Sequence, residues 1–274
     1  MTGPAPTLPP VLFVGAGRMA TAIVKGLLAA GTARPDSLFC TCGDDETGPA
    51  LSRETGVRFF PDPAAALPDA DLVLLACKPQ QAAELPAALG DGTRNKLVLS
   101  ILAGVPLSRI GKIAPDARNR VRVMPNTPAQ IGRGVSAYAS DRPLADSDRS
   151  AVETLLAAMG DFVAVEEKDL DAVTALSGSG PAYVFEFARV LAEAGESLGL
   201  PPETALRLAR GTVGGAADLL EARSGEPPAT LVREVTSPGG TTEAALRVLE
   251  GRFAGLFREA LREARDRSRE LSRA

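Results

Sequence analysis

The chain has 274 residues, of which 45% are hydrophobic and 23% are charged, and its formal net charge is −4. This composition is ordinary for a globular protein, and the length is enough for two domains with cores of their own. The arginines are interspersed with glutamates and form no basic block, which argues against a nucleic-acid-binding protein and favours a small anionic or neutral ligand.

The start of the chain, MTGPAPTLPP, has no basic residue and no apolar segment, and no run of about 18 apolar residues occurs anywhere. We therefore expect a cytoplasmic protein that does not enter membranes, with residues 1–9 disordered. The three cysteines, Cys40, Cys42 and Cys77, are an odd number without the paired spacing of a metal site, and the chain has no histidine. We expect reduced thiols, no bound metal, and Cys40 and Cys77 in strands.

Short apolar runs recur through the first half of the chain and alternate with stretches long enough for a crossover helix. The first run, 11–14, breaks into a glycine-rich turn and then into a helical pattern. The other runs lie at 38–41, 72–76, 97–102, 120–124 and, more weakly, 162–165. Repeated βα units of this kind predict an α/β fold, with a doubly wound, mostly parallel sheet in a Rossmann domain over residues 1–166.

The second half of the chain shows helical patterns only. In 180–199 apolar or small residues recur at the i, i+3, i+4, i+7 spacing of a helix, and the segments 202–223, 227–234 and 241–272 continue in that style. Residues 167–274 are thus predicted to form an all-helical dimerisation domain. Segment 180–199 is apolar on more than one face, which favours at least a dimer built mainly from residues 167–250. The alternative is a self-contained bundle packed against its own Rossmann domain.

The hexapeptide GAGRMA follows the first predicted strand and opens the first helix, which is the context of a dinucleotide-binding turn. Its first glycine permits a tight turn, its second lets a pyrophosphate approach the helix N-terminus, and its last alanine permits close helix–strand packing. The cofactor-binding residues predicted here are Gly15, Ala16, Gly17, Arg18, Met19 and Ala20. A tight turn without a ligand is the alternative interpretation.

The end of the second predicted strand bears on which dinucleotide is bound. Asp44 and Asp45 follow this strand, and the first arginine or lysine after them is Arg53. A carboxylate there accepts hydrogen bonds from the adenosine ribose hydroxyls and repels a 2′-phosphate. The sequence therefore favours NADH over NADPH, with Asp44 as the contact, unless both aspartates are loop residues in solvent.

Six motifs give the chain a resemblance to a known family. FVGAGRMA, ACKPQ, SILAGV, RVMPNTPAQIGRGVSA, ALSGSGPAYV and VTSPGGTT occur in the order and approximate spacing found in pyrroline-5-carboxylate reductases. This resemblance implies reduction of the cyclic imine 1-pyrroline-5-carboxylate to L-proline with NADPH or NADH, the last step of proline biosynthesis. It also implies a helical domain that interleaves with a second subunit, and an active site where domains and subunits meet.

The resemblance further implies particular site residues. Those expected to border the nicotinamide end of the cofactor are Ala76, Cys77, Lys78 and Pro79, with Ala103 on the other side of its ribose. Those expected to bind the substrate are Ser237, Gly240, Thr241 and Thr242, together with Asn126 and Ser179. For Lys78 the alternative is a solvated lysine after a strand. For Ser179 a helix cap is the first interpretation and ligand contact the second.

The loop that contains Thr242 could serve this reaction without a histidine. Backbone N–H groups at a helix N-terminus, together with hydroxyls, can hold the carboxylate of the substrate. Hydride attack on a protonated imine neutralises a cation, so the site needs positioning and one hydrogen-bond partner on the nitrogen more than a strong acid. We assign that catalytic contact to the Thr242 hydroxyl. The alternative is that Thr241 or Thr242 only caps the following helix.

The chain departs from the family pattern near the adenosine. Cys42 and Gly43 stand where relatives commonly carry Asn-Arg or Ser-Arg, and Pro63 stands where the family often places an asparagine. Two other function classes stay open. A related imine or β-hydroxyacid oxidoreductase shares the two-domain plan, although β-hydroxyacid chemistry needs a lysine and none follows Lys168. The other class is a non-catalytic dinucleotide-binding protein on the same fold.

Overall fold

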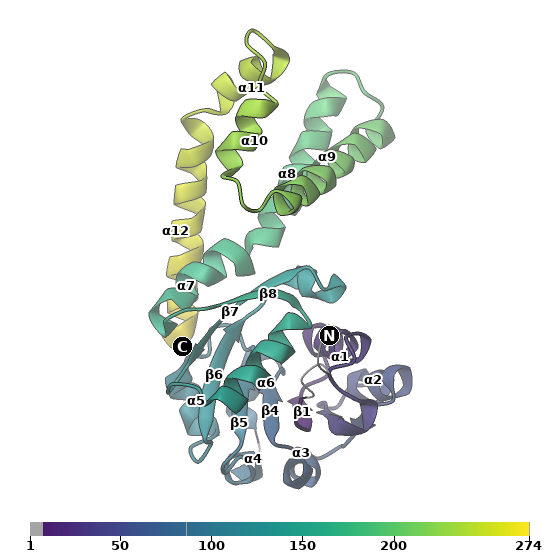
Figure 1. Ribbon diagram of the computed structural model, residues 1–274, viewed down its shortest axis with the longest axis vertical. Helices are drawn as coiled ribbons and strands as arrows, with labels where there is room; N and C mark the ends of the chain where they lie inside the picture. Colours follow the sequence, from purple (N-terminus) through teal and green to yellow (C-terminus); the bar gives the residue numbers. More distant parts are fainter. Residues whose placement is uncertain (1–7, 86, 274) are drawn as a thin grey trace, which may run out of the picture. The chain divides into compact units, whose positions relative to one another are not determined.

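The structure, a computed structural model, describes residues 8–85 and 87–273 (Figure 1). It divides into two compact units. The first runs to Gly178 and also takes in the chain from Ala264 onward, and the second comprises Ser179–Glu263. Of the residues predicted to be disordered, 1–7 lie outside the described residues. The prediction is wrong for Leu8, which is buried and donates its N–H to Thr32 O at 2.9 Å.

The described part of the first unit contains an eight-stranded sheet in the order β3-β2-β1-β4-β5-β6-β7-β8. All neighbouring strands are parallel except β6 and β7. The strands are β1 (Val11–Val14), β2 (Leu38–Thr41), β3 (Arg58–Phe59), β4 (Leu72–Leu75), β5 (Leu97–Ser100), β6 (Asn119–Met124), β7 (Gly134–Ser140) and β8 (Gly160–Ala164). The central strands are continuous buried runs, as expected when helices cover both faces of a parallel sheet.

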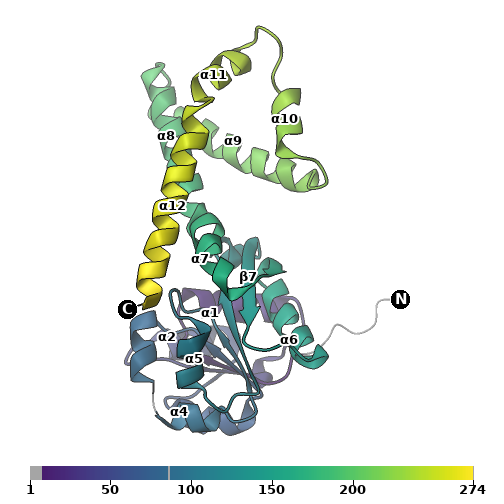
Figure 2. The same cartoon turned by 90° about the vertical axis from the view of Figure 1, so that its left-hand side faces the viewer.

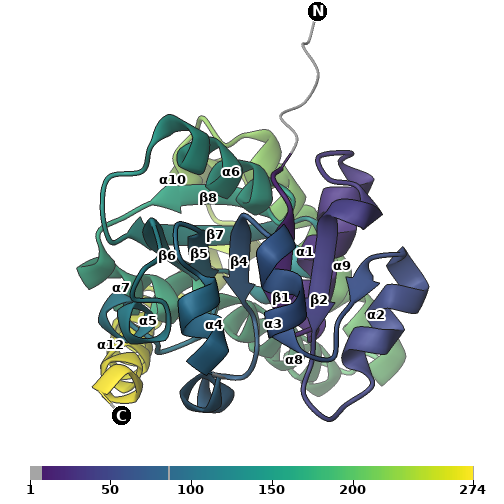
Figure 3. The ribbon, with the colours of Figure 1, turned by 90° about the horizontal axis from the view of Figure 1, so that it is seen from below.

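Helices lie on both faces of this sheet (Figure 3). The α-helices of the first unit are α1 (Arg18–Ala29), α2 (Thr47–Thr55), α3 (Pro63–Ala66), α4 (Ala87–Gly92), α5 (Leu107–Ile113), α6 (Asp146–Ala157) and α7 (Leu170–Val173). The 3₁₀ helices of this unit are η1 (Pro35–Ser37), η2 (Leu67–Asp69), η3 (Pro79–Glu84), η4 (Thr127–Ile131) and η5 (Glu167–Asp169), and η6 (Thr174–Gly178) is a π-helical turn. One core packs β1 residue Phe13 against α1 and α6, and the other packs Leu12 and Val14 against α3, α4 and α5. The predicted doubly wound fold is confirmed.

Two sequence predictions in this unit need correction. The prediction that Cys77 lies in a strand is wrong, because β4 ends at Leu75 and the chain then turns. Strands β3 and β7 were not predicted. The first has only two residues, and β7, with the sequence GVSAYAS, offers small and hydroxylated residues in place of an apolar run. Pairing with the buried strand β6 makes β7 a strand in spite of its weak local pattern.

The second unit is helical, as predicted. It contains α8 (Gly180–Ser197), α9 (Pro202–Ala222), α10 (Pro228–Glu234), α11 (Thr241–Leu249) and the first part of α12 (Arg252–Arg273). Helix α12 is continuous, and its last residues belong to the first unit (Figure 2). Helices α8 and α9 pack closely, since a Cβ added to Gly195 would lie 3.3 Å from the Ala205 Cβ. Gly251, with φ of +79°, separates α11 from α12 inside the segment 241–272.

The first compact unit extends past residue 166, where the sequence places the domain boundary. Leu170 is fully buried against Ala137 and Ala139 of β7, so the start of the helical half packs on the sheet. In addition, Ser268 Oγ donates to Asp171 Oδ1 at 2.7 Å, which ties the end of α12 to the same unit. The compact units therefore follow these packing contacts and not the change from βα to helical pattern.

Candidate active site

The turn between β1 and α1 has the geometry that a dinucleotide needs. Gly15 has φ of +112°, and a Cβ there would lie 2.6 Å from the Ala76 backbone, so only glycine fits. At Gly17, the N-cap of α1, no described atom lies within 4 Å of an added Cβ, and no side chain caps the helix. The α1 N-terminus thus faces open space that an anion could occupy. Ala20, by contrast, is fully buried in the core.

A cavity of about 480 Å³ opens beside this turn, at the carboxyl ends of β1, β2 and β4. The strand order reverses between β1 and β4, and ligands bind at such switch points in doubly wound sheets. Its lining residues include the predicted Gly15, Ala16, Gly17, Ala76, Cys77 and Lys78. Of the other predicted cofactor residues, Arg18 lines an adjoining groove of about 360 Å³ between α1 and α2. Met19, Ala20, Pro79 and Ala103 line neither space.

The loop after β2 places Asp45, and not Asp44, in this cavity. Asp45 Oδ1 accepts hydrogen bonds from the N–H of Thr47, at 2.9 Å, and from its hydroxyl. These bonds from Thr47 lower the pKa of Asp45, with a smaller contribution from the Lys78 ammonium. Asp44, the predicted ribose contact, lines a neighbouring groove of about 400 Å³. A carboxylate therefore does border the cavity, one residue later than the predicted contact.

The segment after β4 forms another wall of the cavity. Lys78 is exposed. Its backbone N–H donates to Gln81 Oε1 at 3.0 Å, and this bond stabilises the start of η3, whose first residue is Pro79. Burial raises the pKa of the Cys77 thiol, so this thiol is neutral at physiological pH. Burial also raises the pKa of Cys40, to about 11. All three cysteines are free thiols, as predicted.

Sequence reasoning missed several residues that line the cavity. These are Val14, Thr41, Thr47, Pro61, Gln81 and Leu85, whereas Pro63, which the family pattern placed near the adenosine, does line the cavity. Thr47 follows an aspartate at the spacing of an Asx turn, and this local signal could have identified it. Pro61 follows β3, a strand too short to predict, so no sequence pattern placed it at the sheet edge.

The side chain of Asn126 makes hydrogen bonds to other residues of the first unit. Its Oδ1 accepts the N–H of Val135 at 2.9 Å, and its Nδ2 donates to Ser177 O at 3.2 Å. The side chain therefore links the end of β6 to the start of β7 and to the turn η6. The amide keeps one N–H and one lone pair beyond these two bonds, so the predicted substrate contact stays a prediction.

The predicted substrate loop belongs to the second unit and forms a tight turn at the start of α11. Gly240 N–H donates to Ser237 O at 3.0 Å, and Gly239 has φ of +73°, which matches a type II turn with proline in its second position. Glu243 Oε2 accepts the Gly239 N–H at 2.7 Å and so fixes the turn to the helix.

The two threonines of this loop are not helix caps. The N-cap of α11 is Gly240, Thr241 and Thr242 are the first two helical residues, and no side chain caps the helix. Among the described residues, neither threonine hydroxyl has a hydrogen-bond partner. Thr242 is half-buried, whereas Thr241 and Ser237 are exposed. The capping alternative for these threonines is therefore wrong, and their hydroxyls are available to a ligand.

Ser179 occupies the N-cap position of α8, and a proline follows in the first turn, as predicted. Its hydroxyl, however, makes no capping hydrogen bond. The first interpretation of this serine, a helix cap, is confirmed by its position, although the cap is not made by its side chain. A contact with substrate stays a prediction.

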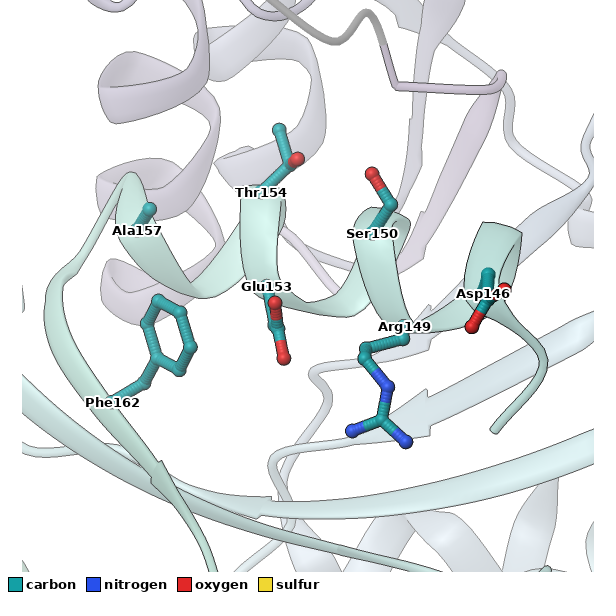
Figure 4. Close-up of a pocket in the computed structure, with 7 residues that line it drawn as sticks. All are labelled: Asp146, Arg149, Ser150, Glu153, Thr154, Ala157 and Phe162. Carbon is teal, nitrogen blue, oxygen red and sulfur yellow. The ribbon is translucent and has the colours of Figure 1, made fainter. Parts of the chain in front are cut away.

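A different hollow lies on the surface between α6 and β8 (Figure 4). It measures about 410 Å³ and is lined by Asp146, Arg149, Ser150, Glu153, Thr154, Ala157 and Phe162. It contains none of the predicted site residues and does not touch the glycine-rich turn. The cavity beside Gly15 is therefore the candidate for the cofactor site.

Within residues 8–85 and 87–273, no three histidine, cysteine, aspartate or glutamate side chains come together as a possible metal site. No helix in the same residues is both long and apolar enough to cross a membrane.

Comparison with known proteins adds independent evidence. Residues 167–271 match the family model described as pyrroline-5-carboxylate reductase dimerisation, and residues 10–104 match that of NADP oxidoreductase, coenzyme F420-dependent. The chain is 38% identical over 261 residues to pyrroline-5-carboxylate reductase 2 of Bacillus subtilis, which covers 94% of each chain. It is 40% identical to the pyrroline-5-carboxylate reductase of Synechocystis, over 95% of this chain and 97% of the relative.

Solved structures agree with these sequence matches. A pyrroline-5-carboxylate reductase from Coxiella burnetii superposes with a TM-score of 0.91 at 36% identity, over 97% of this chain and 99% of the other. The Plasmodium falciparum pyrroline carboxylate reductase, solved with NADP bound, has a TM-score of 0.82 at 27% identity and is covered completely by 98% of this chain.

Proposed function

Because the chain belongs to the pyrroline-5-carboxylate reductase family, we propose roles for its residues in the family reaction. This reaction is the reduction of 1-pyrroline-5-carboxylate to L-proline by hydride transfer from NAD(P)H, the last step of proline biosynthesis. The main support for these roles is the open cavity at the switch point between β1 and β4. It lies beside the N-terminus of α1, which no side chain caps.

The residues of this cavity fit a nicotinamide dinucleotide. Gly15 lets the turn approach the backbone of Ala76, and Gly17 leaves room for a pyrophosphate at the N–H groups of α1. Cys77 and Lys78 border the part of the cavity next to β4, where we place the nicotinamide half. The bound dinucleotide supplies the hydride.

The loop at α11 supplies the polar contacts to the substrate. The N–H groups of Thr241 and Thr242 lie in the first turn of a helix, where a carboxylate is favoured, and both hydroxyls lack protein partners among the described residues. The imine nitrogen keeps its proton while the imine carbon gains the hydride, and the product is a secondary amine. We assign the hydrogen bond on that nitrogen to Thr242, which needs no histidine.

NADH is our proposed preferred cofactor. The carboxylate of Asp45 borders the cavity at the end of β2, where it would repel a 2′-phosphate, and no arginine lines this cavity. Lys78 also borders the cavity, but next to β4, where we place the nicotinamide half, so Asp45 is the charge that we place at the adenosine ribose.

We further propose that the chain acts as a homo-oligomer of at least two copies. The match of residues 167–271 to a dimerisation model supports this, as does the apolar surface that the helices leave exposed. The cytoplasmic location expected from the sequence stays a prediction.

The experiment that tests the function is the oxidation of NADH and of NADPH by the purified protein with 1-pyrroline-5-carboxylate supplied. We expect the absorbance of the reduced cofactor to fall and L-proline to form in equal amount. Cofactor oxidation without proline, or no oxidation with either cofactor, would contradict the proposal.

A further inference from the structure

The side chain of Gln81 lines the cavity beside Gly15 from the short helix η3, which follows β4. Its backbone N–H donates to Lys78 O at 2.9 Å, and its Oε1 accepts the Lys78 N–H at 3.0 Å. Because a backbone N–H can bond only to the oxygen of the amide, this contact fixes which end of the amide is which. Nε2, with its two N–H donors, is the end that is left for other partners.

The Nε2 end of Gln81 lies at the loop that follows β2. Strand β1 separates β2 from β4 in the sheet, so this side chain reaches across the end of β1 (Figure 3). A Cβ built on Gly43 would lie 3.5 Å from Nε2. Within residues 8–85 and 87–273, neither N–H of Nε2 has a hydrogen-bond acceptor. The cavity therefore carries two unused donors beside Gly43.

A carboxylate belongs to the same loop as Gly43. The Asp45 N–H donates to Gly43 O at 2.8 Å, so the two residues form one tight turn, and Asp45 also borders the cavity. The pKa of Asp45 is lowered mainly by its bonds from Thr47 and further by the Lys78 ammonium, which therefore lies nearby. The segment after β4 thus brings amide donors close to the loop after β2, which brings a carboxylate acceptor.

We propose that Gln81 is a further cofactor-binding residue, whose Nε2 donates a hydrogen bond to a hydroxyl of the adenosine ribose. The carboxyl end of β2 is where an acidic residue meets this ribose in dinucleotide-binding folds. A ribose hydroxyl can donate to the Asp45 carboxylate and accept from the Gln81 amide at the same time. The inference rests on the proposed function only in taking this cavity as the dinucleotide site.

The first test removes the amide and measures cofactor binding. Gln81→Met keeps the length of the side chain but has no N–H donor. Gln80→Met is the matched control, because Gln80 is exposed in the same short helix and does not line the cavity. We expect the Kd of NADH to rise about threefold to tenfold in Gln81→Met, as for one lost hydrogen bond, with kcat at saturating NADH changed by less than about twofold. The control should bind NADH as the wild type does.

The second test identifies the ribose by calorimetric titration with ADP, 2′-deoxy-ADP and 3′-deoxy-ADP, which contain no nicotinamide. We expect at least one deoxy compound to bind the wild type about threefold to tenfold more weakly than ADP. This ratio should fall by about twofold or more in Gln81→Met, because the missing hydroxyl has then lost one of its partners. A turn that was merely loosened by the loss of the bond to Lys78 would weaken all three ligands equally.

An unchanged ratio in Gln81→Met, or equal rises in the Kd of NADH in this variant and in Gln80→Met, would overturn the inference. Failure of the wild type to bind ADP would overturn it as well. If the wild type bound NADH but did not reduce 1-pyrroline-5-carboxylate, the proposed reaction would fail while the ratio still decided the inference.

Discussion

At the scale of single residues, the Thr242 hydroxyl is the group on which the chemistry of the substrate depends most. Thr242→Ala should lower kcat/KM for the imine about tenfold to a hundredfold, as for one lost hydrogen bond to a reacting group. Because Gly240 and not Thr242 is the N-cap of α11, Tm should hardly change. Thr242→Ser keeps the hydroxyl and is the control. NADH binding that weakened as much as turnover would mark Thr242 as structural.

The second prediction at this scale concerns cofactor choice. We expect kcat/KM with NADH to equal or exceed that with NADPH, and a tenfold advantage for NADPH, about 1.4 kcal/mol, would contradict this. Asp45→Asn keeps the oxygen that accepts from Thr47 but removes the charge, so it should raise the NADPH to NADH ratio about threefold to tenfold. Asp44→Asn is the matched control. A larger change in the control would identify Asp44 as the ribose contact, as the sequence predicts.

The candidate site could be predicted from the sequence only in part. The glycine-rich turn was predictable because Gly15 and Gly17 meet backbone requirements that few other residues satisfy. The shift from Asp44 to Asp45 was not, since it depends on the hydrogen bonds of a single loop. The two threonines of the α11 loop show the same limit. A cap and a ligand contact share one sequence pattern, and only the position of the helix start separates them.

At the scale of elements, the loop before α11 depends on one carboxylate. Glu243→Ala removes the acceptor for the Gly239 N–H, so the turn from Ser237 to Gly240 should loosen. We expect kcat/KM for the imine to fall about threefold to tenfold with the Kd of NADH unchanged. Arg247→Ala is the control, because it removes only the exposed ion pair that Glu243 makes within the helix. Equal losses in both variants would indicate a general effect on α11.

The strands that are fully buried were the easiest to predict from the sequence. Strands β1, β2, β4 and β5 are fully buried, so each reads as a continuous apolar run with recognisable ends. The long helices of the second half were predictable because their apolar residues recur at the spacing of a helix. Strand β7 and the return of α12 to the first unit were not, because they depend on the partner strand β6 and on contacts such as Ser268 with Asp171. These contacts join residues that are far apart in sequence.

At the scale of the whole molecule, the helical unit leaves much of its apolar surface uncovered. Among its described residues, only three alanines, Ala192, Ala205 and Ala209, are buried hydrophobics. Large side chains are exposed along its helices, including Val184, Phe185, Phe187, Val190, Leu198, Leu206, Leu208, Leu219 and Leu220. Exposed apolar surface of this extent is typical of an interface. The match of residues 167–271 to a dimerisation model indicates that this interface is with a second copy of the chain.

The last prediction is that the active protein is at least a dimer, formed mainly through residues 167–250. Obligate interfaces commonly bury on the order of 2,000 Å² or more and are largely apolar, which suits the exposed face of α8. Phe185→Asp places a charge on that face, where Phe185 is 67% exposed, and should shift the protein towards monomer with loss of activity. Ile131→Asp, at a residue of the first unit that is 77% exposed, should leave the mass unchanged. Light scattering at sub-micromolar concentration measures both variants, and a folded, active wild-type species of 28.3 kDa, the mass of one chain, would refute the dimer.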